Sequence, residues 1–264
     1  MDNKYKKAIA GMLGALAITI GIAYALHPST SAEEVTHQIV TPQTTNGPNS
    51  AETTFSKTRV IKAETKNVLY FNVVVLDPTV DAAISYLSTL SPSSDVWLLI
   101  NSPGGSVFAG ARFIAYLENH KNIHTVCVSL CASMAAHIHQ STDKRYMYSS
   151  GTLMFHPASG GVEGQIENMI SQLNMFKELV DGLDAKIAYR AGINYNEFKR
   201  KVAFQYWVLA NTAVTTKLAD GVVLIETDDA RQPYGVDLYK LMVSSLTPDV
   251  AGEKLRHNMI NLQN

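Results

Sequence analysis

Short apolar runs alternate with helix-compatible segments along the middle of the chain. Residues 68–76, 96–100 and 123–130 are apolar and rich in β-branched or bulky side chains, a pattern typical of strands buried on both faces of a parallel sheet. Residues 80–90 carry apolar side chains at helical spacing, and residues 107–117 form the next predicted helix. This order of strands and helices predicts a layered α/β domain with right-handed crossovers.

The alternation continues through the second half of the chain. The pattern predicts helices at 134–139, 165–190, 194–202 and 212–218, short strands around Tyr146 and Leu153, and strands at 206–209 and 221–225. The apolar residues of the 165–190 helix fall near one face, which by itself indicates packing on the sheet. After residue 228 the pattern weakens, although apolar residues near 238–242 are spaced for a docking helix.

Special residues stand at the ends of three predicted strands. Adjacent glycines follow the run 96–100, Ser133 follows the run 123–130 at the start of a helix, and His156 follows the short strand around Leu153. Strand ends gather at one crevice in open α/β folds, so an uncovered amide, a hydroxyl and an imidazole can converge there. Those groups suffice for acyl transfer, although a serine at a helix start is equally explained as an N-cap.

Three motifs resemble the proteolytic subunit of the Clp protease, within the Clp and crotonase fold group. They are Ile-Asn-Ser-Pro-Gly-Gly-Ser at 100–106, Ala-Ser-Met-Ala at 132–135 and Met-Phe-His at 154–156, and the similarity covers about residues 68–223. The resemblance implies a serine peptidase with Ser133 as the nucleophile and His156 as the general base. It also implies oxyanion amides at Gly105 and Met134, with peptides or unfolded proteins as substrates.

One position departs from the family pattern. The third catalytic residue of the family is an aspartate two positions before an aromatic residue, and here Gln205 stands two positions before Trp207. Glutamine can accept a hydrogen bond from the imidazole but brings no charge, so activity is expected to be lowered or conditional. Asp181 or Asp184 on the preceding helix are alternative sources of the acid.

Two other functions stay open at this level. A protein of this fold that has lost efficient turnover would act as a peptide-binding or scaffold protein, and Gln205 is the best support for that reading. A serine-lysine enzyme similar to signal peptide peptidase A would need a lysine beside the nucleophile, for which Lys144 is the nearest candidate. The presence of His156 favours the serine-histidine reading.

Two segments near His156 have expected roles in binding and assembly. The glycine-rich loop that contains Gly160 and Gly161 follows the candidate base directly, so its backbone is expected to line an extended peptide. The resemblance implies that the long helix at 165–190 joins rings of subunits, which predicts a homo-oligomer.

The N-terminus predicts membrane targeting. Lysines precede an uncharged apolar run at 8–26, so residues 1–26 are expected to be a cleaved signal peptide or a retained transmembrane anchor. Residues 27–57 are polar and form a predicted flexible linker, followed by a Clp-like domain at 58–230 and a tail at 231–264. The domain is then exported to the cell envelope, periplasmic or otherwise outside the cytoplasm, where cleavage would not depend on ATP.

Composition adds two exclusions. The 264 residues are 46% hydrophobic and 17% charged, which suits one packed domain, and a formal net charge of −1 gives no support for nucleic-acid binding. Cys127 and Cys131 are the two cysteines of the chain and are predicted to be buried thiols, and no metal-ligand spacing accompanies them. No cofactor or metal is therefore expected.

Overall fold

The computed structural model describes residues 57–161 and 163–245. Residues Ser56–Ser245 form one compact unit. The predicted leader, nearly all of the predicted linker and the last part of the tail lie outside the described residues.

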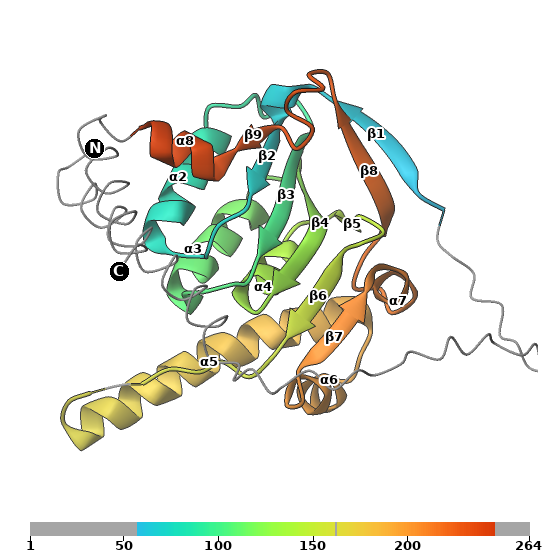
Figure 1. The fold of residues 1–264 in the computed structure, drawn as a ribbon. Helices are drawn as coiled ribbons and strands as arrows, with labels where there is room; N and C mark the ends of the chain where they lie inside the picture. The colour runs from blue at the N-terminus through green and yellow to red at the C-terminus, as the bar shows by residue number, and fades with distance from the viewer. Residues whose placement is uncertain (1–56, 162, 246–264) are drawn as a thin grey trace, which may run out of the picture. The chain divides into compact units, whose positions relative to one another are not determined.

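A curled, mostly parallel sheet runs through this unit (Figure 1). Its strands follow the order β1-β8-β5-β4-β3-β2-β9, and every neighbouring pair in that order is parallel. A further strand, β6, pairs in parallel with the end of β4 and antiparallel with β7. The bounds are β1 Arg59–Ala63, β2 Val68–Phe71, β3 Val96–Ser102, β4 Ile123–Ala132, β5 Arg145–Met147, β6 Thr152–Phe155, β7 Tyr206–Leu209, β8 Gly221–Thr227 and β9 Val236–Asp237.

Helices supply the crossovers that parallel strands require. Helix α3 packs against α2 and against α4 beside the central strands, whereas α5 projects beyond the sheet (Figure 1). The bounds are α2 Asp77–Leu87, α3 Val107–Glu118, α4 Met134–His139, α5 Ile166–Ala191, α6 Tyr195–Val202, α7 Ala210–Thr215 and α8 Leu238–Ser244, with a 3-10 turn at Thr65–Asn67. The predicted layered α/β fold is therefore confirmed.

The differences from the predicted elements have local causes. The strand expected at 68–76 ends at Phe71, and beyond it Val75 makes only an isolated bridge with Gly105. The helix expected at 212–218 begins and ends earlier, at 210 and 215, and Lys217 adopts a φ of 59°, which a helix cannot continue through. Strands β1 and β9 were not predicted because β1 is partly exposed and β9 has two residues.

The core explains why the run at 96–100 is continuously apolar. Trp97 and Leu99 point to one face of the sheet, while Leu98 and Ile100 point to the other, and all four are buried. The first face is closed by a cluster that includes Val126, Val223 and Ile225, where β1 and β8 curl over the sheet. Cys127 and Cys131 are buried free thiols, as predicted, and burial raises the pKa of the Cys131 thiol.

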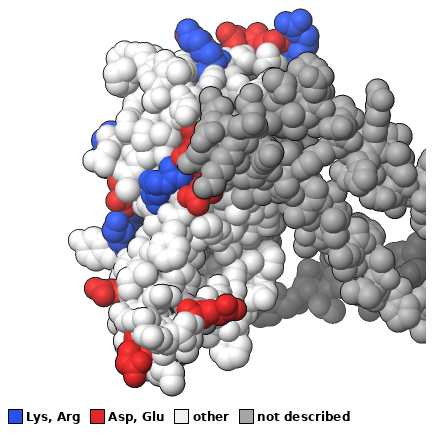
Figure 2. All heavy atoms as spheres, turned by 90° about the vertical axis from the view of Figure 1, so that its left-hand side faces the viewer, with Lys and Arg blue, Asp and Glu red and all other residues white. Residues whose placement is uncertain are grey.

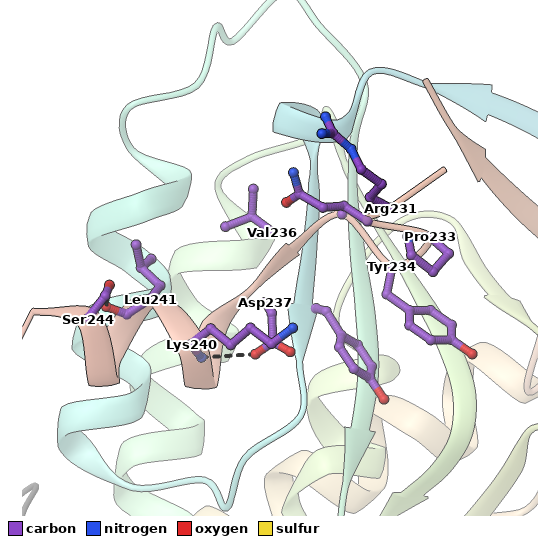
Figure 3. Close-up of a pocket in the computed structure, with 11 residues that line it drawn as sticks. Arg231, Pro233, Tyr234, Val236, Asp237, Lys240, Leu241 and Ser244 are labelled. Carbon is purple, nitrogen blue, oxygen red and sulfur yellow. Dashed lines mark hydrogen bonds between the residues drawn. The ribbon is translucent and has the colours of Figure 1, made fainter. Parts of the chain in front are cut away.

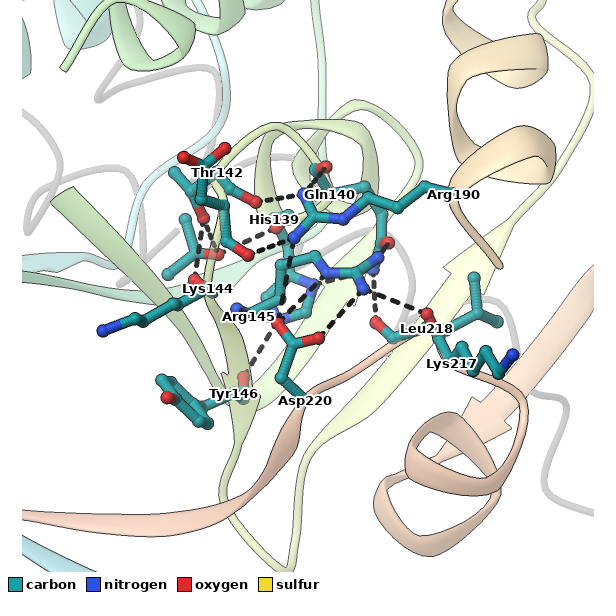
Figure 4. Close-up of polar contacts among 12 residues, drawn as sticks. His139, Gln140, Thr142, Lys144, Arg145, Tyr146, Arg190, Lys217, Leu218 and Asp220 are labelled. Carbon is teal, nitrogen blue, oxygen red and sulfur yellow. Dashed lines mark hydrogen bonds and ion pairs between the residues drawn. The ribbon is translucent and has the colours of Figure 1, made fainter. Parts of the chain in front are cut away.

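A buried polar cluster fastens the end of α5 to the sheet (Figure 4). The Arg145 guanidinium donates to Gln140 Oε1 at 2.6 Å and to Asp220 Oδ1 at 3.2 Å. Arg190, at the end of α5, donates to the Thr142 carbonyl in the same cluster. Because a buried guanidinium is costly unless its donors are paired, these contacts hold α5 in place beside α4.

Candidate active site

The ends of β3, β4 and β6 meet at a small cavity, as the strand-end pattern predicts. The cavity has a volume of about 80 Å³ and brings together residues of helices α3, α4 and α5 and of the segments that follow β3, β4 and β6. It is lined by Gly105, Val107, Ser133, Met134, His137, His156, Ala158, Ser159, Val180 and Leu183.

Ser133 does not act as a helix cap. Its backbone has φ 54° and ψ −127°, outside the usual N-cap conformation, and its side chain makes no capping hydrogen bond. The turn is held by the Ser133 amide, which donates to the Met154 carbonyl at 2.8 Å, and by the Ser133 carbonyl, which accepts from Ala136 N at 2.9 Å. A non-glycine residue in such a conformation costs about 1–3 kcal/mol, and strain of this kind is concentrated at functional sites.

Two residues that line the cavity have backbone amides outside the hydrogen bonds of their neighbours. Met134 is the first residue of α4, so its N–H has no intrahelical carbonyl to bond. Val75 bonds to the Gly104 carbonyl and to the Ser106 amide, both at 2.8 Å, which leaves the Gly105 amide outside this bridge. Gly105 and Met134 both line the cavity, where their amides can serve as donors to an oxyanion.

The His156 ring is held in one tautomer by its own loop. Its Nδ1 lies 2.8 Å from the Pro157 carbonyl oxygen. Because a carbonyl only accepts, Nδ1 carries the hydrogen and Nε2 keeps a free lone pair, which is the tautomer that a general base requires. Ser133 and His156 line the same cavity, and no hydrogen bond between their side chains occurs in the described residues. Such bonds often form only when substrate binds.

Gln205 and His156 both stand at the end of the β6–β7 ladder. Phe155 pairs with Tyr206 as the last pair of this antiparallel ladder, so His156 and Gln205 are the next residues along the two strands. Gln205 has a φ of 60° and an exposed side chain, whose Oε1 accepts from Trp207 Nε1 at 3.4 Å. The Gln205 side chain therefore bonds to the tryptophan, and no hydrogen bond between it and His156 occurs in the described residues.

The two alternative aspartates bond to other partners. Asp184 accepts from His137 Nε2 and from Lys199 Nζ, both at 2.9 Å. Burial alone would raise the pKa of Asp184, but the hydrogen bonds from His137 and Lys199 outweigh it and lower that pKa. Asp181 pairs with Lys177 and with Lys199, and the hydrogen bond from Lys177 lowers the pKa of Asp181 to about 2. Both carboxylates are thus ionised, and their bonds are not to His156.

Three other predicted residues lie outside the cavity lining. The Lys144 carbonyl accepts from Thr125 near the start of β4, while Ser133 follows the end of that strand, so Lys144 is at the wrong end to serve as a base. Gly160 and Gly161 are exposed and have open space around them, and the preceding residues Ala158 and Ser159 line the cavity instead.

His137 is a site residue that the motifs did not single out. It lies one turn after Ser133 on α4, which places both residues on the same helix face, and it lines the cavity. The spacing of four residues was the available signal. Which acid would hold it could not be read from sequence, because Asp184 is 47 residues away along the chain.

A larger cavity lies far from these groups in the sequence and in the fold (Figure 3). It has a volume of about 310 Å³ and lies between Tyr70 and the segment that leads into α8. Tyr70 and Tyr234 stack there with ring centroids 4.9 Å apart. It lacks a serine-histidine pair, so its size does not make it the better candidate for acyl transfer.

On the face shown in Figure 2, basic and acidic side chains are interspersed, and no broad basic area forms. Within the described ranges no helix is both long and apolar enough to cross a bilayer. The same residues bring together no group of three or more candidate metal ligands.

Comparison with known proteins agrees with this geometry. Residues 59–226 match the family model of the Clp protease. The ATP-dependent Clp protease proteolytic subunit 1 of Prochlorococcus marinus (strain MIT 9312) is 31% identical over 145 residues, which cover 54% of this chain and 74% of that protein. The ATP-dependent Clp protease proteolytic subunit 2 of Synechococcus sp. (strain CC9605) is 29% identical over 145 residues, which again cover 54% of this chain and 74% of that protein. These matches support a peptidase, and they show that the chain belongs to the Clp protease family.

Proposed function

We propose that the protein is a serine endopeptidase that cleaves peptide bonds through an acyl-enzyme on Ser133. The observation that carries this proposal is the strained turn at Ser133, whose hydroxyl is not used as a cap and whose neighbours in one cavity are His156 and two backbone amides. The same turn presents the N-terminus of α4 to the cavity, where the free amides favour negative charge.

Each step uses groups that line the cavity. Ser133 Oγ attacks the peptide carbonyl while His156 Nε2 takes the hydroxyl proton, and the Gly105 and Met134 amides bind the oxyanion. His156 then gives that proton to the leaving amine as the carbon–nitrogen bond breaks. Water, deprotonated by the same nitrogen, attacks the ester, and the proton returns to Ser133 as the acid product leaves.

A fluorophosphonate probe tests this function directly. We expect the purified full-length protein, without nucleotide, to form one phosphonyl adduct that mass spectrometry locates on the peptide containing Ser133. Adduct formation on another residue, or equal labelling of the Ser133→Ala variant, would contradict the assignment of the nucleophile.

Replacing Gln205 with Asp should raise the rate. A carboxylate opposite His156 would orient the imidazole and stabilise the imidazolium, and loss of that charge in a serine peptidase lowers kcat by about 10⁴-fold. We therefore expect Gln205→Asp to raise kcat by at least about tenfold, since only the charge has to be supplied at a position already in register. Gln205→Asn, which shortens the side chain without adding charge, is the control and should bring no gain.

A second candidate function is peptide binding with little turnover. It is favoured by the exposed Gln205 side chain and by the lack of a Ser133–His156 side-chain hydrogen bond within the described residues. Tight binding of unfolded peptide by an assembled protein that neither labels nor hydrolyses ester substrates would support this alternative over the peptidase.

We also propose that the chain forms a homo-oligomer through α5. The projecting part of this helix exposes large apolar side chains, among them Ile166, Ile170, Leu173 and Met175, with 48–66% of each exposed. We expect Ile170→Asp and Leu173→Asp to yield smaller particles in sedimentation velocity than the wild type. Gln172→Asp, which adds the same charge at an exposed polar position of α5, should leave the particle size unchanged.

From the N-terminal segment we propose that the domain is exported or membrane-anchored and that it cleaves peptides without ATP. The apolar run with its basic flank supports it, whereas the names of the relatives describe ATP-dependent proteases. Protease added to intact cells, or to spheroplasts if an outer membrane is present, should degrade the domain. The proposal would be overturned if the domain resisted the added protease in intact cells and in spheroplasts and if peptide cleavage by the protein required ATP.

A further inference from the structure

His137 connects the nucleophile's backbone to a buried ionic network. Its Nδ1 lies 3.1 Å from the Ser133 carbonyl oxygen, and its Nε2 lies 2.9 Å from Asp184 Oδ1. The Asp184 side chain is 3% exposed and also accepts from Lys199 on α6. The imidazole therefore bridges the start of α4 to α5 and α6.

Both ring nitrogens of His137 face acceptors. The Asp184 carboxylate is ionised and the Ser133 carbonyl has no hydrogen, so the ring is the donor in a hydrogen bond to either of them. Asp184 pairs with Lys199, and Asp181 pairs with Lys177 and Lys199, so the two carboxylates and the two lysines carry equal and opposite charge. Paired and hydrogen-bonded in this way, the Asp184 carboxylate can be kept in a buried place.

The Ser133 carbonyl and the Met134 amide belong to one peptide unit. This bond is trans, since the described residues contain no cis peptide, and a trans peptide is planar with its C=O and N–H pointing in opposite directions. Holding the Ser133 carbonyl toward the body of α4 therefore aims the Met134 N–H away from the helix and into the cavity. A hydrogen bond from the imidazole to the carbonyl also polarises the peptide, which strengthens its N–H as a donor.

We infer that His137 is a positioning residue of the oxyanion hole: clamped by Asp184, it orients and polarises the Met134 N–H through the Ser133–Met134 peptide. The expected effect on kinetics rests on the proposed peptidase function. The expected effect on the Met134 amide does not depend on that function. In this role His137 acts through the Ser133–Met134 peptide, and His156 alone carries the proton.

The test compares His137→Phe with His137→Asn. Phenylalanine keeps a ring of similar size but donates nothing, and asparagine places an amide nitrogen near the former Nδ1, from which it can donate to the Ser133 carbonyl. His120→Phe is the matched control, because His120 Nδ1 lies 2.7 Å from the Tyr116 carbonyl, also four residues earlier, at the end of α3 away from the cavity.

The kinetic readout separates positioning from folding. Active sites are counted with the fluorophosphonate. We expect His137→Phe to lower kcat per site at least about tenfold and to leave KM within about twofold of the wild type. This loss is smaller than that caused by complete removal of an oxyanion donor, because the Met134 N–H is still present. A peptidyl boronate should lose affinity by the same factor, and His137→Asn should recover part of both. Unchanged kcat per site and boronate affinity in His137→Phe would mean a structural role alone and overturn the inference.

The amide readout does not need catalysis. In protein labelled with [¹⁵N]methionine, the Met134 amide resonance, assigned with Met134→Leu, should move upfield in His137→Phe, return partly in His137→Asn and stay in place in His120→Phe. A Met134 resonance unmoved by His137→Phe contradicts the inference. If the wild type shows no turnover, the proposed function fails, and this resonance alone decides the role of His137.

Discussion

Ser133→Ala is expected to lower kcat for peptide hydrolysis by at least about a thousandfold. Removal of the nucleophile in serine peptidases costs up to about 10⁶-fold, and the smaller figure allows for a site that already lacks an orienting carboxylate. The fold should stay intact because Ser133 is held by its backbone, through the Met154 carbonyl and the Ala136 amide, and not by its side chain. Progress curves at saturating peptide measure the change.

Ser141→Ala is the matched control for this substitution. Ser141 lies just past the end of α4, and its hydroxyl donates to the Ile138 carbonyl at 2.8 Å. The variant should keep its turnover and its fluorophosphonate adduct. Equal loss in both variants would indicate damage to α4, and retained turnover in Ser133→Ala would require another nucleophile.

Gly104→Ala should damage stability and catalysis together. Gly104 has a φ of 95°, and an added Cβ would lie 2.6 Å from the Ala132 carbonyl oxygen and 2.7 Å from Ser133 Cβ. The unfavourable dihedral and the overlap together should cost about 3 kcal/mol, which corresponds to a fall of about 6–12 °C in Tm. Since the overlap pushes directly on the nucleophile turn, we expect kcat to fall by about a hundredfold or more in the fraction that stays folded.

Gly161→Ala provides the comparison, because a Cβ at Gly161 would meet nothing within 4 Å. Its Tm should stay within about 1 °C of the wild type, as for an exposed loop position without a special dihedral. Differential scanning calorimetry and the peptide assay measure both variants. A Gly104→Ala protein with wild-type Tm and rate would show that the glycine loop does not rest on Ser133 in solution.

Local signals were sufficient for most of the fold. The continuous apolar run at 96–100 predicted a strand buried on both faces, and β3 is such a strand. Asn194 was assigned to the start of a helix and is its N-cap, with its side chain accepting from Asn196 N and Glu197 N. Strand β1 was missed because none of its residues is buried and it is held by pairing with β8, more than 160 residues away along the chain.

The sequence by itself determined the order of the elements and the three strand ends at which a glycine pair, a serine and a histidine stand, because these depend on local periodicity and on parallel strands sharing an edge. Only the tertiary structure decided how the groups around Ser133 are partnered. Asp184, left open as the acid for His156, bonds instead to His137 and Lys199, and Gln205 stands at the same ladder end as His156 but bonds to Trp207. Hydrogen-bond partners distant along the chain depend on how helices pack and strands register, which local spacing does not encode.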